Sequence, residues 1–366
     1  MLDFQNMSQI EQLFDDMEPV NLAGEAFVPS LHAEEIRLDD SEPEAENEEE
    51  LSSFEDANLG PFQTFGPTEA ALPLVAIDAG VLDLGMSRTG FALAFKAAVV
   101  EQDVTGTHTV TKIGPQVKFI APDNRAELLR YVGRSMSNES MFVTMHEDGS
   151  CTIKKGATEP NQFKDRIRNF IERMLQVDVV QQLTNGILLV DGALTLRTFN
   201  TPQIFLEQLS REAAAHNSEI VGISKKSRIT VDGVHIGALL DYDAPDAGYR
   251  KINQVDAEGS EADPESRNLG APFAVRFAPG GFTFRADVTR ESLFLNEEAV
   301  LDALYANTQM TLGYPNLLRL AHIHSAFTKD EIISLQVQAA HNYQVSMHAP
   351  EDLSVIFAPF RKGLGG

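Results

Sequence analysis

The chain contains a single cysteine, Cys151, among its 366 residues. One thiol can form neither an intramolecular disulfide nor a thiolate zinc cluster, so both are excluded. Long apolar runs are also missing, since none approaches the roughly 18 residues that span a bilayer. The N-terminus lacks the charged-then-apolar pattern of a secretory signal. We therefore expect a cytoplasmic protein of a reducing compartment, without membrane attachment.

Basic residues are scarce relative to acidic ones, because 29 Lys and Arg face 54 Asp and Glu, for a formal charge of -25. The imbalance is concentrated at one end. Residues 1–60 hold 18 acidic residues against Arg37 alone, a charge of -17, which leaves -8 for the other 306 residues. Such a mildly acidic body does not exclude a nucleic-acid partner, because a groove needs a local basic lining rather than a basic total.

Residues 1–60 are predicted to form an acidic, largely disordered tail. From Glu34 to Asp56 the chain is dominated by Asp, Glu, Ser and Pro, with too few apolar residues to order itself. Apolar residues at helical spacing nevertheless predict one short amphipathic helix, on Ile10, Leu13, Phe14 and Met17. Either the tail only keeps the protein in solution, or its helix docks in a partner's groove.

The folded body is predicted to start near Leu72 and to reach His324, with a C-terminal segment at 325–366. Its centre is Asn185–Leu194, where four apolar residues follow Asn-Gly and lead to Asp191, as in a strand covered on both faces. Periodicity around it predicts strands near 74–78, 91–96, 107–119 and 219–223, with helices at 162–183 and 202–216. Residues 229–310 are predicted to be an inserted, β-rich subdomain.

Three acidic residues are predicted to meet at one edge of this sheet. Asp78 ends an upstream strand as Asp191 ends the central one, and the carboxyl ends of strands are where open α/β sheets hold their chemistry. Glu172 lies mid-helix on the margin of the apolar stripe. Clustered carboxylates repel until a cation neutralises them, and hard oxygen ligands favour Mg²⁺ or Mn²⁺. Acids in this strand, helix and strand order are typical of an RNase H-like mixed sheet flanked by helices.

Each acid also has an ordinary interpretation when it is taken alone. A strand-terminal aspartate often caps a turn or helix. Glu172 could pair with Arg168 or Gln176 on the helix surface. Asp83 is near enough to Asp78 to replace it, whereas Asp241 and Asp243 are interpreted as loop residues.

A hairpin is predicted around Pro279-Gly280-Gly281, with alternating apolar residues on both sides. If the two glycines are the loop, Arg276 lies opposite Arg285. Like charges directly opposite destabilise a strand pair, so the pair suggests an anion site such as a phosphate. The alternative is two surface arginines in another register.

Five blocks of the chain together resemble the NurA nuclease family. The resemblance covers Leu72 to His324 and is most specific at the Asp191 and Lys225 blocks. The matching pieces are Ile77-Asp78, Glu172, Leu189-Val190-Asp191-Gly192-Ala193-Leu194, Val221-Gly222-Ile223-Ser224-Lys225-Lys226-Ser227-Arg228, and Gly313-Tyr314-Pro315 with His322 eight residues after the tyrosine. One block departs from the pattern, because the family usually has Asp-Gly-Ser where this chain has Asp78-Ala79-Gly80.

The resemblance implies a homodimeric DNA nuclease with 5′-to-3′ exonuclease and single-strand endonuclease activity, working with a hexameric HerA-type ATPase on DNA ends. It implies that the acids bind Mn²⁺ or Mg²⁺ and that Tyr314 and His322 complete the site. The DNA phosphates are assigned to basic residues, namely Arg88, Lys225, Lys226, Arg228, Arg276 and Arg285.

Two rival hypotheses come from other functional classes. One is a non-catalytic adaptor that keeps the fold to bind DNA or the ATPase, and the other is an RNase H-like nuclease acting on RNA. Tyr314 could simply pack in a turn, His322 could be a core histidine, and Lys225–Arg228 could be a solvated strand end.

Overall fold

The computed structural model describes residues 2–16, 22–30, 58–68, 71–154, 160–194, 202–225, 230–231, 234–235, 238, 240, 246–253, 269–289 and 296–347. Across these ranges no helix has the length and apolar character needed to cross a membrane.

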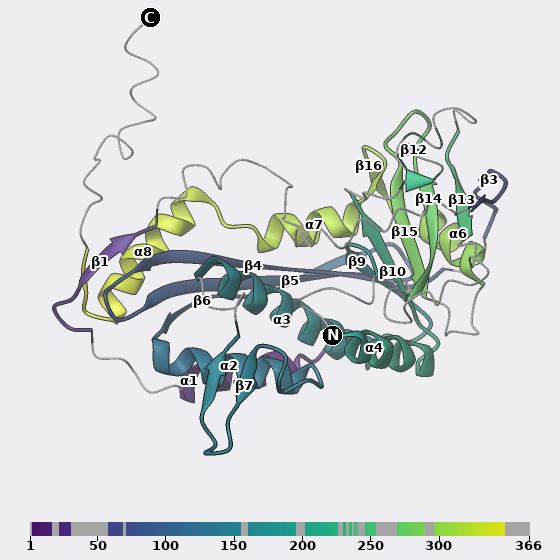
Figure 1. Cartoon of the computed structure of the whole chain (residues 1–366). Coiled ribbons are helices and arrows are strands. Elements are labelled where there is room, and N and C mark those ends of the chain that lie inside the picture. Colours follow the sequence, from purple (N-terminus) through teal and green to yellow (C-terminus); the bar gives the residue numbers. More distant parts are fainter. Residues whose placement is uncertain are drawn as a thin grey trace, which may run out of the picture.

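The fold is built on one large mixed sheet (Figure 1). Strands β4 (Leu74–Met86), β5 (Phe91–Gln102) and β6 (His108–Ile120) form an antiparallel meander. Next to β4 lies β9 (Ile187–Asp191), parallel to it, and beyond β9 lies β10 (Glu219–Ser224), parallel to β9. The spatial order β6-β5-β4-β9-β10, with helices between β6 and β9 and between β9 and β10, is RNase H-like, so the predicted fold class is confirmed.

The β-rich segment after β10 extends this same sheet. Strand β15 (Phe284–Thr289) pairs antiparallel with β10, and β14 (Gly270–Arg276) and β13 (Gly248–Asn253) follow outward. Two short strands, β2 (Asn58–Leu59) and β3 (Gln63–Thr64), pair with β13 at the edge. All residues of β15 and β14 are buried, including the polar residues Arg285, Asp287 and Thr289 that alternate with the apolar ones along β15.

Strand alternation divides the core into two main layers. Val75, Ile77, Leu188 and Val190 face a cluster with the helices α1 (Gln5–Asp16), α2 (Pro122–Ser135), α3 (Pro160–Val180) and α4 (Gln203–Ala215). Leu74, Ala76, Ile187 and Leu189 face the other cluster, with α6 (Glu297–Asn307) and α7 (Asn316–Ser325). Figure 1 shows α3 and α7 on opposite sides of β4 and β5.

A third cluster covers the far end of the meander. Helix α8 (Lys329–Asn342) packs on β4 and β6 beside β1 (Ala26–Pro29) and β18 (Ser346–Met347). Its N-terminus carries a capping box, in which Thr328 and Glu331 each accept a backbone N–H of the other. Smaller hairpins are β7 (Val143–Met145) with β8 (Cys151–Ile153), β11 (Thr230–Val231) with β12 (Val234–His235), and β16 (Met310–Thr311) with β17 (Tyr314–Pro315).

The predicted tail at 1–60 needs correction at its start. Its amphipathic helix is present as α1, but Met7, Ile10 and Phe14 are buried in the protein's own core against α3. The ring of Phe14 stacks on Phe95, with centroids 5.2 Å apart. The folded body therefore starts long before Leu72. The acidic stretch 31–57 lies outside the described residues.

The predicted register of the Arg276 hairpin is wrong. Ala274, not Arg276, pairs with Arg285, so the connection is longer than two glycines and Arg276 aligns with Thr283. The two arginines are diagonal neighbours on one sheet face, where long side chains can diverge. Both are buried, at 3% and 6% exposure, rather than on the surface.

Candidate active site at the carboxyl edge of the central strands

Asp78 and Asp191 lie level with each other on adjacent parallel strands. The β4–β9 ladder pairs Leu74 with Ile187 and ends at Ala76 and Leu189. Two further residues along each strand bring the register to Asp78 and Asp191. Asp191 ends β9 as predicted, but the prediction that Asp78 ends its strand is wrong, because β4 continues to Met86. Both then project to the face that α7 covers, because alternate residues share a face. The chain leaves β9 at Gly192, whose φ of +128° favours glycine.

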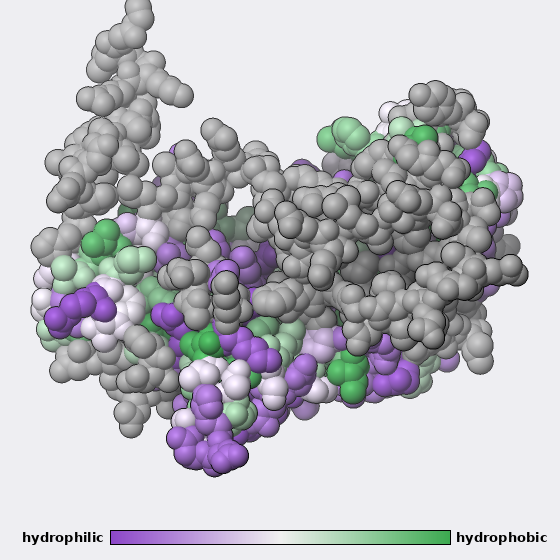
Figure 2. All heavy atoms as spheres, in the orientation of Figure 1, coloured by the Kyte–Doolittle hydropathy of each residue, from purple (hydrophilic) through white to green (hydrophobic). Residues whose placement is uncertain are grey.

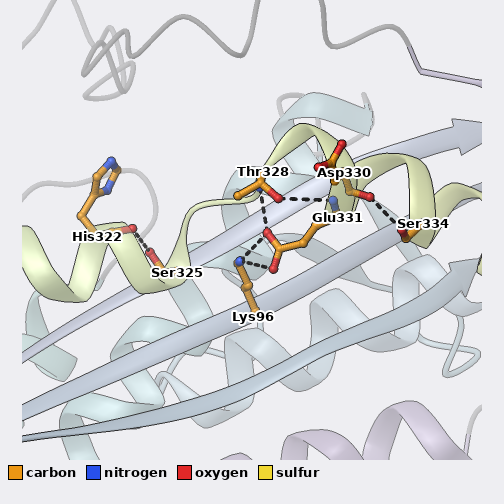
Figure 3. Close-up of polar contacts among 7 residues, drawn as sticks. All are labelled: Lys96, His322, Ser325, Thr328, Asp330, Glu331 and Ser334. Carbon is orange, nitrogen blue, oxygen red and sulfur yellow. Dashed lines mark hydrogen bonds and ion pairs between the residues drawn. The ribbon is translucent and has the colours of Figure 1, made fainter.

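Asp78 is almost completely buried, at 7% exposure, and α7 holds it through one oxygen. His322 Nδ1 lies 3.1 Å from Asp78 Oδ2, and the Ser325 hydroxyl donates to the same oxygen. Ser325 also donates to the carbonyl of His322, at 3.0 Å, as Figure 3 shows. Asp78 Oδ1 accepts no hydrogen bond from any described residue. One carboxylate oxygen is therefore fixed and the other is left for a further ligand.

Asp191 is held from two other elements. Lys225 Nζ donates to its Oδ2 at 2.8 Å, and the Tyr314 hydroxyl donates to its Oδ1 at 3.1 Å. The Lys225 ammonium also lies 5.0 Å from the centroid of the Tyr314 ring, and that ring packs on Phe284. The strand end after β10 and the β16–β17 hairpin thus converge on one carboxylate.

The pKa of His322 depends on the charges of both aspartates. Its hydrogen bond with Asp78 raises the pKa of the imidazole above the usual value, although burial opposes the shift. The charge of Asp191 raises the same pKa and the charge of Lys225 lowers it. The protonated imidazole is favoured because two carboxylates surround it and only one ammonium opposes them.

Glu172 lies on α3, the helix that packs against the other face of the sheet. Its Oε1 accepts from Gln176 Nε2 at 3.2 Å, and Gln176 accepts in turn from Arg173 at 2.8 Å. The pairing with Gln176 considered from the sequence is therefore present. Within the part of the chain that the structure describes, no group of three or more His, Cys, Asp or Glu side chains is arranged to hold a metal ion. A third ligand role for Glu172 stays a prediction.

The remaining basic residues lie in different places. Arg88 is exposed in the β4–β5 turn, ten residues beyond Asp78 along β4, roughly 33 Å at the usual rise of a strand. There a hydrogen bond from Thr89, and to a smaller extent the Arg88 charge, lower the pKa of Glu25. Arg88 is thus remote from the two aspartates. Lys226 and Arg228, like Asp241 and Asp243, lie outside the described residues.

Arg285 has a structural partner that the sequence analysis missed. Its Nε donates to Asp287 Oδ1 at 2.8 Å, and Asp287 is completely buried. The other oxygen of Asp287 accepts the backbone N–H of Leu194, also at 2.8 Å. This pair fixes the segment that follows Asp191. Burial of Arg285 and Arg276 does not support their predicted contact with DNA phosphates.

Asp78 receives its hydroxyl contact from α7 rather than from its own strand, because the two residues that follow it are Ala79 and Gly80 and the donor is Ser325. A Cβ at Gly80 would lie 2.4 Å from the carbonyl oxygen of Ser325, so glycine permits this close approach. A sequence signal existed, because Ser325 follows His322 by three residues and shares its helix face.

The carboxylate oxygens of this site are of the type that hard divalent cations prefer as ligands. Two carboxylates on adjacent strands are ligands that Mg²⁺ or Mn²⁺ accepts, and Oδ1 of Asp78 has no competing donor among the described residues. Lys225 already places a positive charge 2.8 Å from Asp191, so this carboxylate pairs with a cationic group in the structure.

No protein-family model matches the chain, and no curated protein sequence matches it. Solved structures do resemble it. The NurA nuclease from Sulfolobus solfataricus is 16% identical with a TM-score of 0.47, over 78% of this chain and 88% of that one. Another NurA structure is 12% identical with a TM-score of 0.37, over 93% and 98%. Endonuclease V from Bacillus subtilis is 14% identical with a TM-score of 0.33, over 79% and 90%. These structural neighbours are nucleases. Because one fold hosts many activities, the function proposed below is based on the side chains of this chain.

Proposed function

We propose that this protein is a metal-dependent nuclease that hydrolyses phosphodiester bonds in DNA. The observation that carries the proposal is the site at the carboxyl edge, where Asp78 and Asp191 lie level on parallel strands. His322, Tyr314 and Lys225 surround them with an imidazole, a phenol and an ammonium. This is the combination that phosphodiester hydrolysis needs, with anionic ligands, a proton carrier and a positive charge for the phosphate.

Each residue has a defined task in this proposal. Asp78 and Asp191 would hold Mn²⁺ or Mg²⁺, with Glu172 as a predicted third ligand. The bound cation would activate water and stabilise the charge on the scissile phosphate. Tyr314 orients Asp191 through its hydroxyl. His322, fixed at Nδ1 by Asp78, can take or give a proton at its other ring nitrogen.

Lys225 would change partner when substrate and cation arrive. Asp191 would hold the cation at the carboxylate that Lys225 contacts at 2.8 Å, and the two positive charges would then compete for its oxygens. The freed ammonium would then pin a phosphate as a point charge. Of the basic residues assigned to DNA, Lys225 is the one placed beside the aspartates by a described contact.

The more specific part of the proposal, which concerns cleavage type and partners, comes from the five sequence blocks. Their resemblance to NurA supports 5′-to-3′ exonuclease and single-strand endonuclease activity in DNA end processing. It also supports a homodimer bound to a HerA-type hexameric ATPase.

The test compares two charge-neutral variants with a matched control. Purified full-length protein is stripped with EDTA, Mn²⁺ is added back, and cleavage of labelled single-stranded and duplex DNA is followed. Asp78→Asn and Asp191→Asn are each expected to lose at least about 100-fold in rate, as for other groups that act in the chemical step. Asp103→Asn, in the exposed β5–β6 turn, should retain activity. Wild-type rates in both site variants with unchanged folding would refute the proposal.

The adaptor hypothesis is favoured by one observation, since the described residues do not gather three metal-ligating side chains. Manganese binding decides between the two. A nuclease should bind Mn²⁺ through the aspartates and lose that binding in Asp191→Asn, whereas an adaptor should bind DNA equally well with the acids neutralised. A matched RNA strand in the same cleavage assay tests the RNA-directed hypothesis.

A further inference from the structure

Two large apolar side chains stand out from the protein surface. Leu312 is 86% exposed and Phe282 is 74% exposed, and these are the highest values for large hydrophobic residues in the described ranges. Figure 2 shows apolar surface at the upper right of the molecule, in the region where Figure 1 has β14 and β16. Single exposed apolar side chains are ordinary, so what matters is whether these two lie together and beside the candidate site.

Both side chains lie at the edge of the sheet that carries Asp191. Strand β15 pairs with β10 through Arg285 and Ser224, next to Lys225, and Phe282 lies three residues beyond Arg285, on the order of 10 Å away. Leu312 precedes Tyr314 by two residues, and the Tyr314 hydroxyl donates to Asp191. The two turns also pack together, because a Cβ at Gly313 would lie 3.4 Å from the Cβ of Ala278.

Leu312 occupies a backbone position that disfavours it. Thr311 pairs with Tyr314, so Leu312 and Gly313 form a two-residue hairpin loop, with φ of +54° and +79°. Such a turn prefers Asn-Gly or Asp-Gly, because asparagine and aspartate tolerate positive φ and a branched apolar residue does not. Leucine there costs about 1 kcal/mol of strain in addition to its exposure. Neither the turn nor the core explains this residue, and strain of this kind often marks a functional position.

We propose that Phe282 and Leu312 form a base-binding platform for single-stranded nucleic acid beside the cleavage site. Phe282 stacks on one unpaired base, and Leu312 packs against a neighbouring base while Lys225 and the aspartates hold the backbone. An aromatic ring stacks on any base because every base has a π-face. Single strands fit better than duplex, since paired bases present only their edges. This inference rests on the nuclease function proposed above.

A protein partner fits these two residues less well. A stable protein interface buries about 800 Å² on each side, which two exposed side chains on adjoining turns do not supply. A base needs only one aromatic ring and one apolar neighbour.

The chain has no tryptophan, which gives a direct test. Phe282→Trp gives the chain its single tryptophan, whose emission should be quenched when an oligothymidylate stacks on it. The measurement is made in EDTA, so that no cleavage is needed. Val104→Trp is the matched control, because Val104 is 56% exposed and lies in the β5–β6 turn. This turn is at the N-terminal end of β4, since Gln102 pairs with Leu74. Quenching in both variants, or in neither, would overturn the proposal.

Affinity measured by anisotropy in EDTA gives the second readout. Phe282→Ala should weaken binding of a single strand about fivefold to 140-fold, which corresponds to ~1–3 kcal/mol for one stacked base. Leu312→Ala should weaken it less, and duplex affinity should change little in either variant. Leu312→Asn restores the preferred turn residue, so it should stabilise the fold while weakening single-strand binding. That opposite pair of effects is not expected of a purely structural residue.

The outcomes separate this inference from the nuclease proposal. If Phe282→Ala binds single strands like the wild type while metal-dependent cleavage persists, the platform is wrong and the nuclease function stands. If the wild-type protein neither binds nor cleaves nucleic acid, both proposals fail.

Discussion

Gly80→Ala is expected to harm stability and activity together, because a single methyl group would push β4 and α7 apart. The added Cβ would lie 2.4 Å from the carbonyl oxygen of Ser325 and 3.4 Å from a ring carbon of Phe327. The ring can move, but the carbonyl belongs to the last turn of α7. Relief therefore requires a backbone shift of about 1 Å, the difference from an ordinary contact near 3.4 Å.

The magnitude follows from what α7 carries. Forcing a methyl group into a well-packed contact typically costs about 1–3 kcal/mol. The same shift moves Ser325 and His322, which together fix Asp78 Oδ2. A displacement of about 1 Å in a group that positions a catalytic site can reduce the rate by roughly 100-fold. The variant should therefore fold, unfold at a lower denaturant concentration, and cleave DNA far more slowly.

The assay combines urea unfolding with Mn²⁺-dependent DNA cleavage. Gly60→Ala is the matched control, because its Cβ would meet its nearest atom, the Lys251 carbonyl oxygen, at 3.4 Å. It should leave both readouts close to the wild type. A Gly80→Ala protein with an unchanged unfolding midpoint and unchanged cleavage would refute the close contact and with it the described grip of α7 on Asp78.

Three further predictions test other parts of the structure. The pKa of His322, followed by NMR titration, should lie above 6.5 and should fall in Asp78→Asn; no change would exclude the Asp78 contact. Burial alone would raise the pKa of Glu331, but hydrogen bonds from Thr328 and Lys96 bring it below its usual value. The carboxylate therefore stabilises the fold above pH 4.5, and this contribution is lost as the pH falls through the folded pKa. Because glutamine can still complete the capping box, Glu331→Gln removes only the charge of the Lys96 pair shown in Figure 3, whose carboxylate is 38% exposed. The variant should cost up to about 1 kcal/mol at pH 7, and the difference from the wild type should disappear in acid. Phe14→Ala should cost about 3–5 kcal/mol in urea unfolding, whereas a free tail would show no loss.

The elements with strong internal periodicity could be predicted from the sequence. The apolar run of β9, the alternation of β5 and the helical stripe of α3 each define their own structure, because local spacing sets which face is buried. Helices α2 and α8 were missed, although the Thr328-x-x-Glu331 capping box of α8 is a readable sequence signal. Pro122 opens α2 without a side-chain cap.

Register and partner choice could not be predicted in the same way. The length of the β14–β15 connection depends on how Phe277 and Phe284 pack in the second core, and this moved Arg276 two residues away from the predicted pairing. Helix α1 has the composition of a free amphipathic segment. Only its packing against α3 shows that its apolar face is buried within the same chain.

The sequence alone determined that Asp191 ends a buried strand, that Asp78 lies on another buried strand, and that the sheet is RNase H-like. These features are local, because they depend on residue spacing within single elements. Only the tertiary structure decided that α7 reaches Asp78 with both His322 and Ser325, that Arg285 belongs to Asp287, and that α3 packs on the sheet face opposite α7. Such contacts join residues more than 200 positions apart at Asp78, and packing of whole layers, not local spacing, brings them together.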